Sequence, residues 1–356
     1  MPRRAASAEP ADRRATIRDV AKAAGVSIAT VSRVLGGTYP TAAATRTRVM
    51  RAVRDLDYVV NSHARALAGI STKSVAIVVS SVVSPFYAHV AQAVETQAAQ
   101  EGRLCLISTT GGDLRRELGA LKLMLEEHAE AVILIGNVVD NDEYRRRVGE
   151  YARALAAAGS QLVLCGRPAP GPDVPAIVVD YDNTGGARAA TGHLLSAGHR
   201  RILYLGHKPG YTTSEGRIAG YREALAAHGV PEDPGLVLAG GALERQEGYR
   251  LMRERLRAAE PDFTAVFAAN DQLAAGGRQA LHEHGLRIPE DISLMGYDDL
   301  PPATDIGLTT THVPHDELGR TAVRLALQRD RAGGADDHVV LGTHVVVRQS
   351  VRPLTG

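Results

Sequence analysis

Residues 20–35 read VAKAAGVSIATVSRVL, an alanine-rich helical segment that a glycine interrupts before a second helical pattern begins. Gly25 suits the left-handed backbone that ends a helix. Ser27 can cap the next helix by accepting a hydrogen bond from its first turn. The stretch therefore predicts a helix, a tight turn and a second helix.

Apolar positions recur at helical spacing on both sides of this turn, which indicates that the two helices pack together. These positions are Val20, Ala21, Ala24, Val31, Val34 and Leu35. The second helix turns a different set outward or towards its ends: Ser27, Ile28, Ala29, Thr30, Ser32 and Arg33. Short polar groups with one cation suit a groove, and an ordinary helical hairpin fits this segment equally well.

A third helix follows in residues 41–58, where Thr41 can cap it and Val49, Val53 and Leu56 form an apolar stripe. The next segment, residues 61–73, has too few apolar residues to anchor itself, so we interpret it as a linker that becomes helical conditionally. Residues 1–14 are basic and polar, and we interpret them as a solvated tail.

The formal charge is divided unevenly along the chain. The net charge is +1, but residues 1–73 hold 13 Lys and Arg against 5 Asp and Glu, which leaves +8 there and −7 in the remainder. A basic head can neutralise phosphates, whereas an acidic body discourages nucleic acid from binding elsewhere.

From residue 74 onward, short β-branched runs alternate with amphipathic helices. The runs are SVAIVVS, RLCLIS, AVILIG, QLVLC, AIVVD, RILYLG, TAVFAAN and ISLMGY. Continuous apolar strands between helices predict parallel sheets covered on both faces, and the length of the region favours two lobes. Ligands of such sheets bind beyond the carboxyl ends of the strands, which directs attention to the residues that follow each run.

The sequence shows none of the common catalytic or phosphate-binding motifs, so we expect no catalytic site, no metal and no cofactor. His282 and His284 are two residues apart, which would place them on different sides of a helix. We therefore expect solvated surface histidines there and not a metal site. Cys105 and Cys165 lie in apolar runs typical of buried free thiols, and we interpret Asp271, at a strand end, as a helix cap. No apolar run approaches a membrane span and the start lacks a signal core, so we expect a cytoplasmic protein without a membrane partner.

Ordered motifs along residues 16–352 resemble transcriptional regulators of the lac repressor (LacI/GalR) family. In the head these are IRDVAKAAGVSIATVSRVLGG, TRTRV, LDYVVN and ARALAG. In the body they are SPFY, GHRRILYLG, RIAGYREAL, TAVFAANDQLAAGG, IPEDISLMGYDDLP and LTTTHVPHDELGR. The resemblance implies a helix-turn-helix head, a hinge, and a two-lobed α/β core like that of periplasmic binding proteins, with parallel sheets.

The resemblance also implies domain boundaries: a basic tail over residues 1–14, a DNA-binding domain over 15–60 and a hinge over 61–73. The effector-binding and dimerisation core would span 74–356. Its first lobe would comprise about 74–178 and 310–337, and its second lobe about 179–309 and 338–356.

The resemblance assigns double-stranded operator DNA to the head. The helix from Ile28 would enter the major groove, with Ile28, Ala29 and Arg33 at base edges. Phosphate contacts would come from Ser27, Thr30 and Ser32. In the hinge, Asn61, Arg65 and Leu67 would contact DNA, with Leu67 inserted between bases in the minor groove. Val60 replaces the proline common before the hinge Asn61.

A small polar effector, sugar-like, would bind between the lobes. By alignment with family positions its contacts would be Phe86, Tyr87, Tyr211, Thr213, Arg217, Asn270, Asp298 and His315. Gly166 stands where many members carry Asp, and Leu243 where several present an aromatic residue, so the pocket departs from that of a standard hexose.

The resemblance predicts a repressor that binds a palindromic operator as a homodimer and that the effector controls. The sequence also leaves two alternative functions open. A solute-binding protein for sugar uptake would have the same two lobes without needing a basic head. An enzyme on an α/β sheet would need a catalytic constellation that the motifs do not supply.

Overall fold

The computed structural model describes residues 15–36, 41–58, 74–328 and 338–354. The chain divides into two compact units, Met1–Thr72 and Lys73–Gly356.

The first unit contains the three predicted helices, α1 (Ile17–Ala24), α2 (Ile28–Gly36) and α3 (Ala43–Asp55). Gly25 has the expected left-handed backbone, with φ of 64°, and Ser27 Oγ accepts a hydrogen bond of 3.1 Å from the Thr30 N–H. The helix-turn-helix is therefore confirmed. Val20, Val31 and Val49 are fully buried at its centre.

Two details of the head differ from the prediction. The N-cap position of α3 is Ala42, one residue after Thr41. Leu56 is 36% exposed because the helix ends at Asp55 and Leu56 already belongs to the turn; Tyr58, which is 8% exposed, packs into the core instead. The apolar stripe of α3 therefore includes Val49 and Val53 but not Leu56.

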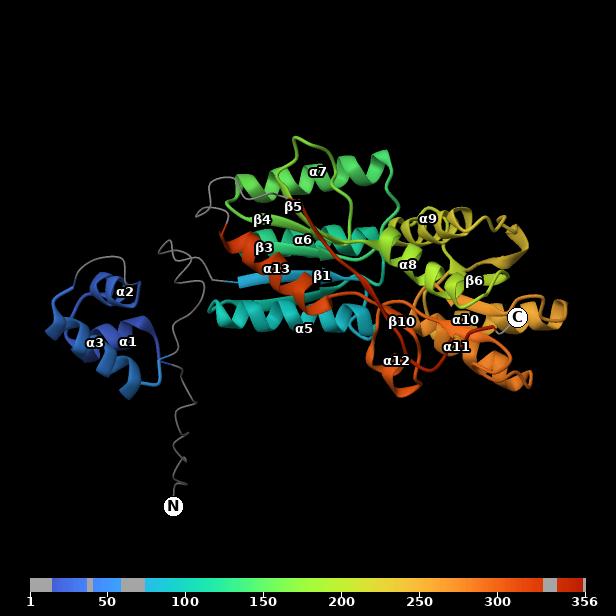
Figure 1. Cartoon of the computed structure of the whole chain (residues 1–356). Coiled ribbons are helices and arrows are strands. Elements are labelled where there is room, and N and C mark those ends of the chain that lie inside the picture. Colours follow the sequence, from blue (N-terminus) through green and yellow to red (C-terminus); the bar gives the residue numbers. More distant parts are fainter. Residues whose placement is uncertain (1–14, 37–40, 59–73, 329–337, 355–356) are drawn as a thin grey trace, which may run out of the picture. The chain divides into compact units, whose positions relative to one another are not determined.

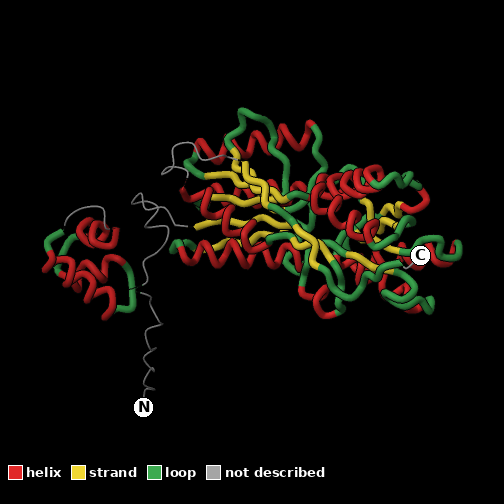
Figure 2. Tube along the Cα trace, viewed as in Figure 1, coloured by secondary structure: helices red, strands yellow, loops and turns green. Residues whose placement is uncertain are grey.

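The second unit contains a parallel six-stranded sheet in the order β11-β5-β4-β3-β1-β2, which with its helices forms the first lobe (Figures 1 and 2). The strands are β1 (Ser74–Val79), β2 (Leu104–Thr109), β3 (Ala131–Ile135), β4 (Gln161–Cys165), β5 (Ala176–Tyr181) and β11 (His338–Leu341). Helices α5 (Pro85–Gln100) and α13 (His315–Gln328) cover one face, and α6 (Leu114–Glu126) and α7 (Asp142–Ala157) cover the other. The apolar runs of β1, β3, β4 and β5 are almost entirely buried, as predicted, whereas β2 at the edge of the sheet is partly exposed.

The second lobe has a parallel four-stranded sheet in the order β7-β6-β8-β9. Its strands are β6 (Ile202–His207), β7 (Val237–Ala239), β8 (Ala265–Ala268) and β9 (Ser293–Met295). Its helices are α8 (Asn183–Ser196), α9 (Thr212–Ala227), α10 (Arg245–Ala258), α11 (Asp271–Glu283) and α12 (Pro301–Asp305), with the short 3₁₀ turn η1 (Pro234–Leu236). An antiparallel pair, β10 (Thr310–His312) and β12 (His344–Val346), lies beside this sheet.

The expected lobe boundaries need correction. Strand β5 runs on to Tyr181 within the first sheet, and β11 pairs with it from His338 opposite Val178 to Leu341 opposite Tyr181. Residues 338–341 thus belong to the first lobe, not to the second. Backbone N–H and C=O groups at the free edge of β5 form hydrogen bonds with β11. The composition of residues 338–341 alone does not reveal this pairing.

Candidate functional site

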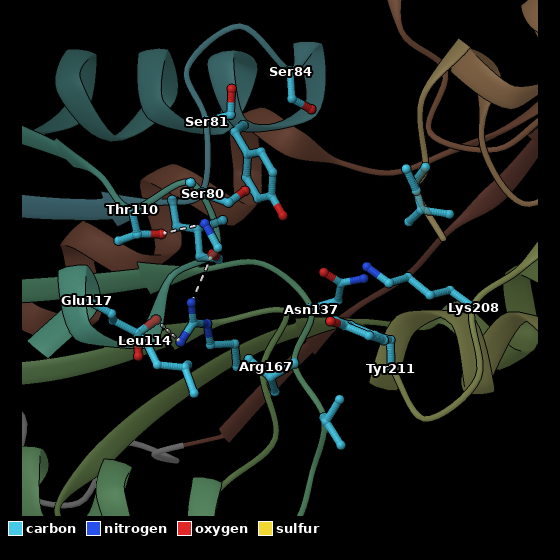
Figure 3. A pocket seen from close by; sticks show the side chains of 18 of the residues that line it. Ser80, Ser81, Ser84, Thr110, Leu114, Glu117, Asn137, Arg167, Lys208 and Tyr211 are labelled. Atoms are coloured by element: carbon cyan, nitrogen blue, oxygen red, sulfur yellow. Dashed lines mark hydrogen bonds and ion pairs between the residues drawn. The ribbon is translucent and has the colours of Figure 1, made fainter. Parts of the chain in front are cut away.

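A cavity of about 710 Å³ opens between the lobes, where the carboxyl ends of β1 to β4 face the loops of the second lobe. A smaller recess of about 80 Å³ adjoins it, and Ser84, Tyr87, Asn137 and Leu243 line both spaces. Figure 3 shows part of the larger space, which is called the outer cavity below; the smaller is the inner recess. Both spaces lie at the edge where parallel sheets commonly bind ligands.

The inner recess contains a buried ion pair between Arg217 of α9 and Asp298, which follows β9. Arg217 Nη2 lies 2.9 Å from Asp298 Oδ1, and each side chain is 5% exposed. The guanidinium also donates to Asn183 Oδ1 at 2.9 Å and to the Ala269 carbonyl. Its Cζ lies 3.8 Å from the centroid of the Tyr297 ring. These partners hold the guanidinium in one place, so the recess offers a fixed charged surface to a polar ligand.

Burial shapes the charges in this recess. It raises the pKa of Asp298 to about 6, although the Arg217 charge opposes the shift. For Arg217, burial favours the neutral form, but the charges of Asp298 and of the nearby tyrosines together outweigh it, so the pKa of Arg217 rises. The pair is therefore charged at neutral pH and begins to neutralise near pH 6.

Asn270 lines the recess but has its side chain engaged within the protein. Its Nδ2 donates to the Leu243 carbonyl at 3.0 Å, and its Oδ1 accepts from the Leu273 N–H at 2.8 Å, which makes Asn270 the cap of α11. The interpretation of Asp271 as that cap is wrong. Asp271 is buried and accepts from Thr310 Oγ1 at 2.6 Å and from the Leu300 N–H at 2.8 Å, and burial together with Asp298 raises its pKa to about 8.

Phe86 and Tyr87, at the start of α5, both line the recess, with ring centroids 5.5 Å apart. Gly136 makes room for Tyr87, because a Cβ built on Gly136 would lie 2.6 Å from Tyr87 Oη. His315 was expected in the pocket but lines neither space. It packs behind Phe86, with ring centroids 5.1 Å apart, because it begins α13 on the covered side of the sheet.

The second lobe contributes Thr213 to the recess and Tyr211 to the outer cavity. Lys208 Nζ lies 3.8 Å from the centroid of the Tyr211 ring, and Figure 3 shows Lys208 extending towards Asn137 of the first lobe. Nearby, the Thr212 N–H donates to the Val138 carbonyl at 2.9 Å. This hydrogen bond joins the lobes across the cleft.

The head presents the predicted residues on α2 and its turn. Ile28 is 44% exposed, and Ala29 and Arg33 are also exposed. Thr30 Oγ1 and Ser27 Oγ lie 2.9 Å apart, while Ser32 is half-buried. Asn61, Arg65 and Leu67 lie outside the described residues.

Comparison with known proteins decides the family. Residues 16–61 match the model of the bacterial regulatory proteins of the lacI family, and residues 191–351 match the periplasmic binding protein-like domain. The regulator CelR of Thermobifida fusca is 35% identical over 347 residues, covering 95% of this chain and 98% of CelR. This chain belongs to the LacI family. It is a helix-turn-helix transcriptional regulator.

Other relatives of this LacI-family regulator agree. GalS of Salmonella typhimurium is 34% identical, with 95% of each chain covered. Among solved structures, the lac repressor dimer bound to operator and an anti-inducer has a TM-score of 0.81 at 26% identity, covering 96% of this chain and all of that one. The CelR–cellobiose complex has a TM-score of 0.68 at 33% identity, covering 95% of this chain and all of that one.

Several residues of the site were missed by sequence reasoning. Arg167 and Glu117 form an ion pair of 3.0 Å that lines the outer cavity, and their side chains are 7% and 6% exposed. Arg167 lies two residues after Cys165, where β4 ends, so the expectation that ligands bind beyond strand ends offered a signal for it. Glu117 lies inside α6, 50 residues away in sequence, and nothing in its surroundings marks it.

Two observations concern other kinds of site. Within the described ranges, no cluster of three or more His, Cys, Asp and Glu side chains could hold a metal ion. No helix in the same part of the chain is long and apolar enough to cross a membrane.

His282 and His284 are exposed, as predicted. Both cysteines are free, with Cys165 buried and Cys105 half-buried.

Proposed function

We propose that this regulator represses transcription by binding a palindromic operator as a homodimer and releases it when a sugar-like effector binds between the lobes. The observation that carries the effector assignment is the buried Arg217–Asp298 pair, whose charges line the inner recess at the lobe junction. A charged pair in a cleft orients hydroxyl groups, which accept from the guanidinium and donate to the carboxylate. We assign the regulator no catalytic role, and we place the protein in the cytoplasm, where its DNA is.

In this proposal α2 reads the operator. Arg33 donates two hydrogen bonds to a guanine, and Ile28 and Ala29 contact thymine methyl groups. Ser27, Thr30 and Ser32 contact phosphates, which positions the helix without reading sequence. The hinge residues Asn61, Arg65 and Leu67 complete the contact in the minor groove.

The effector contacts follow from the lining of the two spaces. Phe86, Tyr87, Thr213, Arg217, Asn270 and Asp298 line the recess, and Tyr211 lines the outer cavity. Tyr87 offers its ring for stacking and its hydroxyl for hydrogen bonding. His315 has a supporting role behind Phe86. The CelR–cellobiose complex, a sugar-bound relative of the same fold, supports a sugar as the ligand.

Control of DNA binding requires that the effector and the operator prefer different arrangements of the lobes. The Thr212–Val138 hydrogen bond ties the second lobe to the loop after β3 in the first. An effector that contacts both lobes shifts the balance of lobe arrangements, and thermodynamic linkage makes it alter operator affinity by the same factor by which operator alters effector affinity.

An exposed apolar face on the first lobe supports the homodimer. Strand β2 lies at the edge of its sheet and carries exposed apolar side chains: Leu104 is 66% exposed and Ile107 is 49% exposed. On α6, Leu118 is 37% exposed and Leu114 48%. An uncovered apolar edge strand promotes association, so a second copy of this chain covering this face accounts for its composition.

The test is selection of DNA from a random duplex library by the full-length protein at fixed salt, followed by sequencing. We expect enrichment of a palindrome, and we expect a sugar from a panel of mono- and disaccharides to weaken binding to it. Absence of any enriched sequence would contradict the DNA-binding function and favour the solute-binding alternative. A sugar that strengthens operator binding would make the effector a corepressor.

A further inference from the structure

The two spaces between the lobes differ greatly in size. A buried water needs about 10–15 Å³ of such volume, so the inner recess of about 80 Å³ holds on the order of six waters, comparable to one sugar ring. The outer cavity, at about 710 Å³, is about nine times larger. The two are joined at Tyr87 and Leu243, which line both. A ligand anchored in the recess therefore has room to continue outward.

The outer cavity has a polar wall of its own, made by Arg167 and Glu117. Gly166 has a left-handed backbone, with φ of 63°, and lines the recess, whereas Arg167 lines only the outer cavity. Arg167 Nη1 donates to Glu117 Oε2 at 3.0 Å, and Nη2 reaches the Ile135 carbonyl at 3.4 Å. Figure 3 shows the pair on one side of the cavity, with Lys208 and Tyr211 on the other.

This ion pair is incompletely satisfied. Arg167 Nε and Glu117 Oε1 are buried and have no hydrogen-bond partner. Buried charged groups normally use all their donors and acceptors, because each unused one costs free energy. The pair thus has one spare donor and one spare acceptor, and hydroxyl groups can both accept and donate hydrogen bonds.

The charges of the pair also restrict the class of ligand. Arg167 is already neutralised by Glu117, and the carboxylate would repel an incoming anion. Two further cations line the cavity: Arg147 is paired with Glu143 at 3.6 Å, and Lys208, on the opposite wall, lies over the Tyr211 ring. The wall therefore favours an uncharged polyhydroxyl ligand over a phosphorylated or carboxylated one.

We propose that the outer cavity is a second sugar subsite, in which the Arg167–Glu117 ion pair binds hydroxyl groups of the second ring of a neutral oligosaccharide whose first ring occupies the inner recess. The inference rests on the proposed sugar-regulated function and narrows it, because a monosaccharide would leave the outer cavity unused. Binding requires the pair to turn slightly towards the cavity, since its two unused atoms are covered in this structure.

The experiment titrates the full-length protein by calorimetry with glucose, galactose, cellobiose, maltose, lactose, glucose 6-phosphate and glucuronate. We expect at least one disaccharide to bind at least about tenfold more tightly than its constituent monosaccharide and than the two anionic sugars. Equal affinity for a disaccharide and its monosaccharide, or tighter binding of an anionic sugar, would overturn the subsite and leave the sugar-regulated function standing. If none of these sugars binds, the result would count against both the subsite and the sugar-regulated function.

Variants then test the named pair. Glu117→Gln keeps the side-chain size, and the double variant Glu117→Leu with Arg167→Met removes both charges, so that neither is left buried alone. Each variant should weaken disaccharide binding at least about tenfold and leave the affinity for the monosaccharide unchanged. The matched control is Arg103→Met with Glu130→Leu, which removes an ion pair of 2.8 Å at the amino ends of β2 and β3. Equal losses for both sugars in folded Glu117 variants would overturn the proposal.

Discussion

Arg217 of α9 and Asp298 after β9 lie 2.9 Å apart in the inner recess, although 81 residues separate them in sequence. Helix α9 and the loop after β9 are thereby joined, and the Tyr297 ring lies against the same guanidinium. Because a buried charge without its partner is costly, each member of the pair fixes the other. In the proposed function, this fixed pair binds hydroxyl groups of the effector.

Replacing Asp298 by Asn keeps the shape of the recess and removes the charge. We expect the effector affinity at pH 7.5 to fall at least about tenfold, since hydrogen bonds to charged groups are worth roughly 1.5–3 kcal/mol. In the unmodified protein, burial raises the pKa of Asp298 to about 6, so its charge is lost on acidification through that pH. Effector affinity should therefore fall between pH 7.5 and 5.5 in the unmodified protein and change less in Asp298→Asn. An equally steep profile in the variant would contradict this role.

Gly136→Ala tests the position of Tyr87. The added methyl group would lie 2.6 Å from Tyr87 Oη, so the ring must move away from the junction of the two spaces. We expect effector affinity to fall about tenfold, the equivalent of about 1.4 kcal/mol. Gly159→Ala is the matched control, because Gly159 also has a positive φ, 79°, but its Cβ would meet nothing within 4 Å. Both variants should lose stability from backbone strain, whereas only Gly136→Ala should lose effector affinity.

His315 predicts a pH dependence of stability. Burial, with the charges of His89, His312 and Arg217, lowers its pKa to about 3. The unfolded chain takes up a proton near pH 6.5 and the folded chain does not, so stability from this group is complete above pH 6.5 and is lost on acidification. The loss at pH 5 is about 2 kcal/mol.

Urea unfolding of the unmodified protein and of His315→Gln at pH 7 and pH 5 measures this effect. Glutamine does not titrate, so the variant should lose about 2 kcal/mol less than the unmodified protein between the two pH values. The comparison uses the change with pH within each protein, which removes any cost of the substitution itself. Equal changes in the two proteins would show that His315 is accessible to protons in the folded state.

Arg33→Ala tests reading of the operator by α2. Arg33 is exposed and its removal should leave thermal stability unchanged. A bidentate contact to guanine is worth about 1–3 kcal/mol, so we expect operator affinity to fall about 5- to 150-fold and specificity to relax at one base pair of each half-site. Arg54→Ala, an exposed cation in the last turn of α3, is the control for net charge. Equal losses in both variants would indicate a purely electrostatic role.

Much of the fold could be predicted because local rules and packing agree. Gly25 and Ser27 fix the turn of the head by backbone conformation and capping, and the apolar strands of both lobes are long enough to be recognised. The strands β7, β10 and β12, of three residues each, were not among the predicted runs. Strand β11 was assigned to the wrong lobe because pairing with β5 is decided by the free edge of the sheet and not by its own composition.

The site was predicted less completely, for a different reason. Residues that follow strands, such as Arg217's partner Asp298, can be located from sequence because parallel strands end at a common edge. His315 was misplaced because only the packing of α13 determines whether its first side chain faces the cleft or Phe86. Glu117 was missed because its partner Arg167 is distant in sequence and an isolated glutamate on a helix is typical of solvent-exposed positions.

The most direct test of effector control measures operator binding by fluorescence anisotropy with full-length protein and the palindrome selected from the random library. A sugar found to bind the unmodified protein should raise the operator Kd at least about fivefold, the lower end of ordinary allosteric coupling. In Arg217→Met, which keeps the length of the side chain but removes its charge, the same sugar should leave the operator Kd unchanged. An equal shift in Arg217→Met, or no shift in the unmodified protein with the sugar bound, would contradict control of DNA binding through the inner recess.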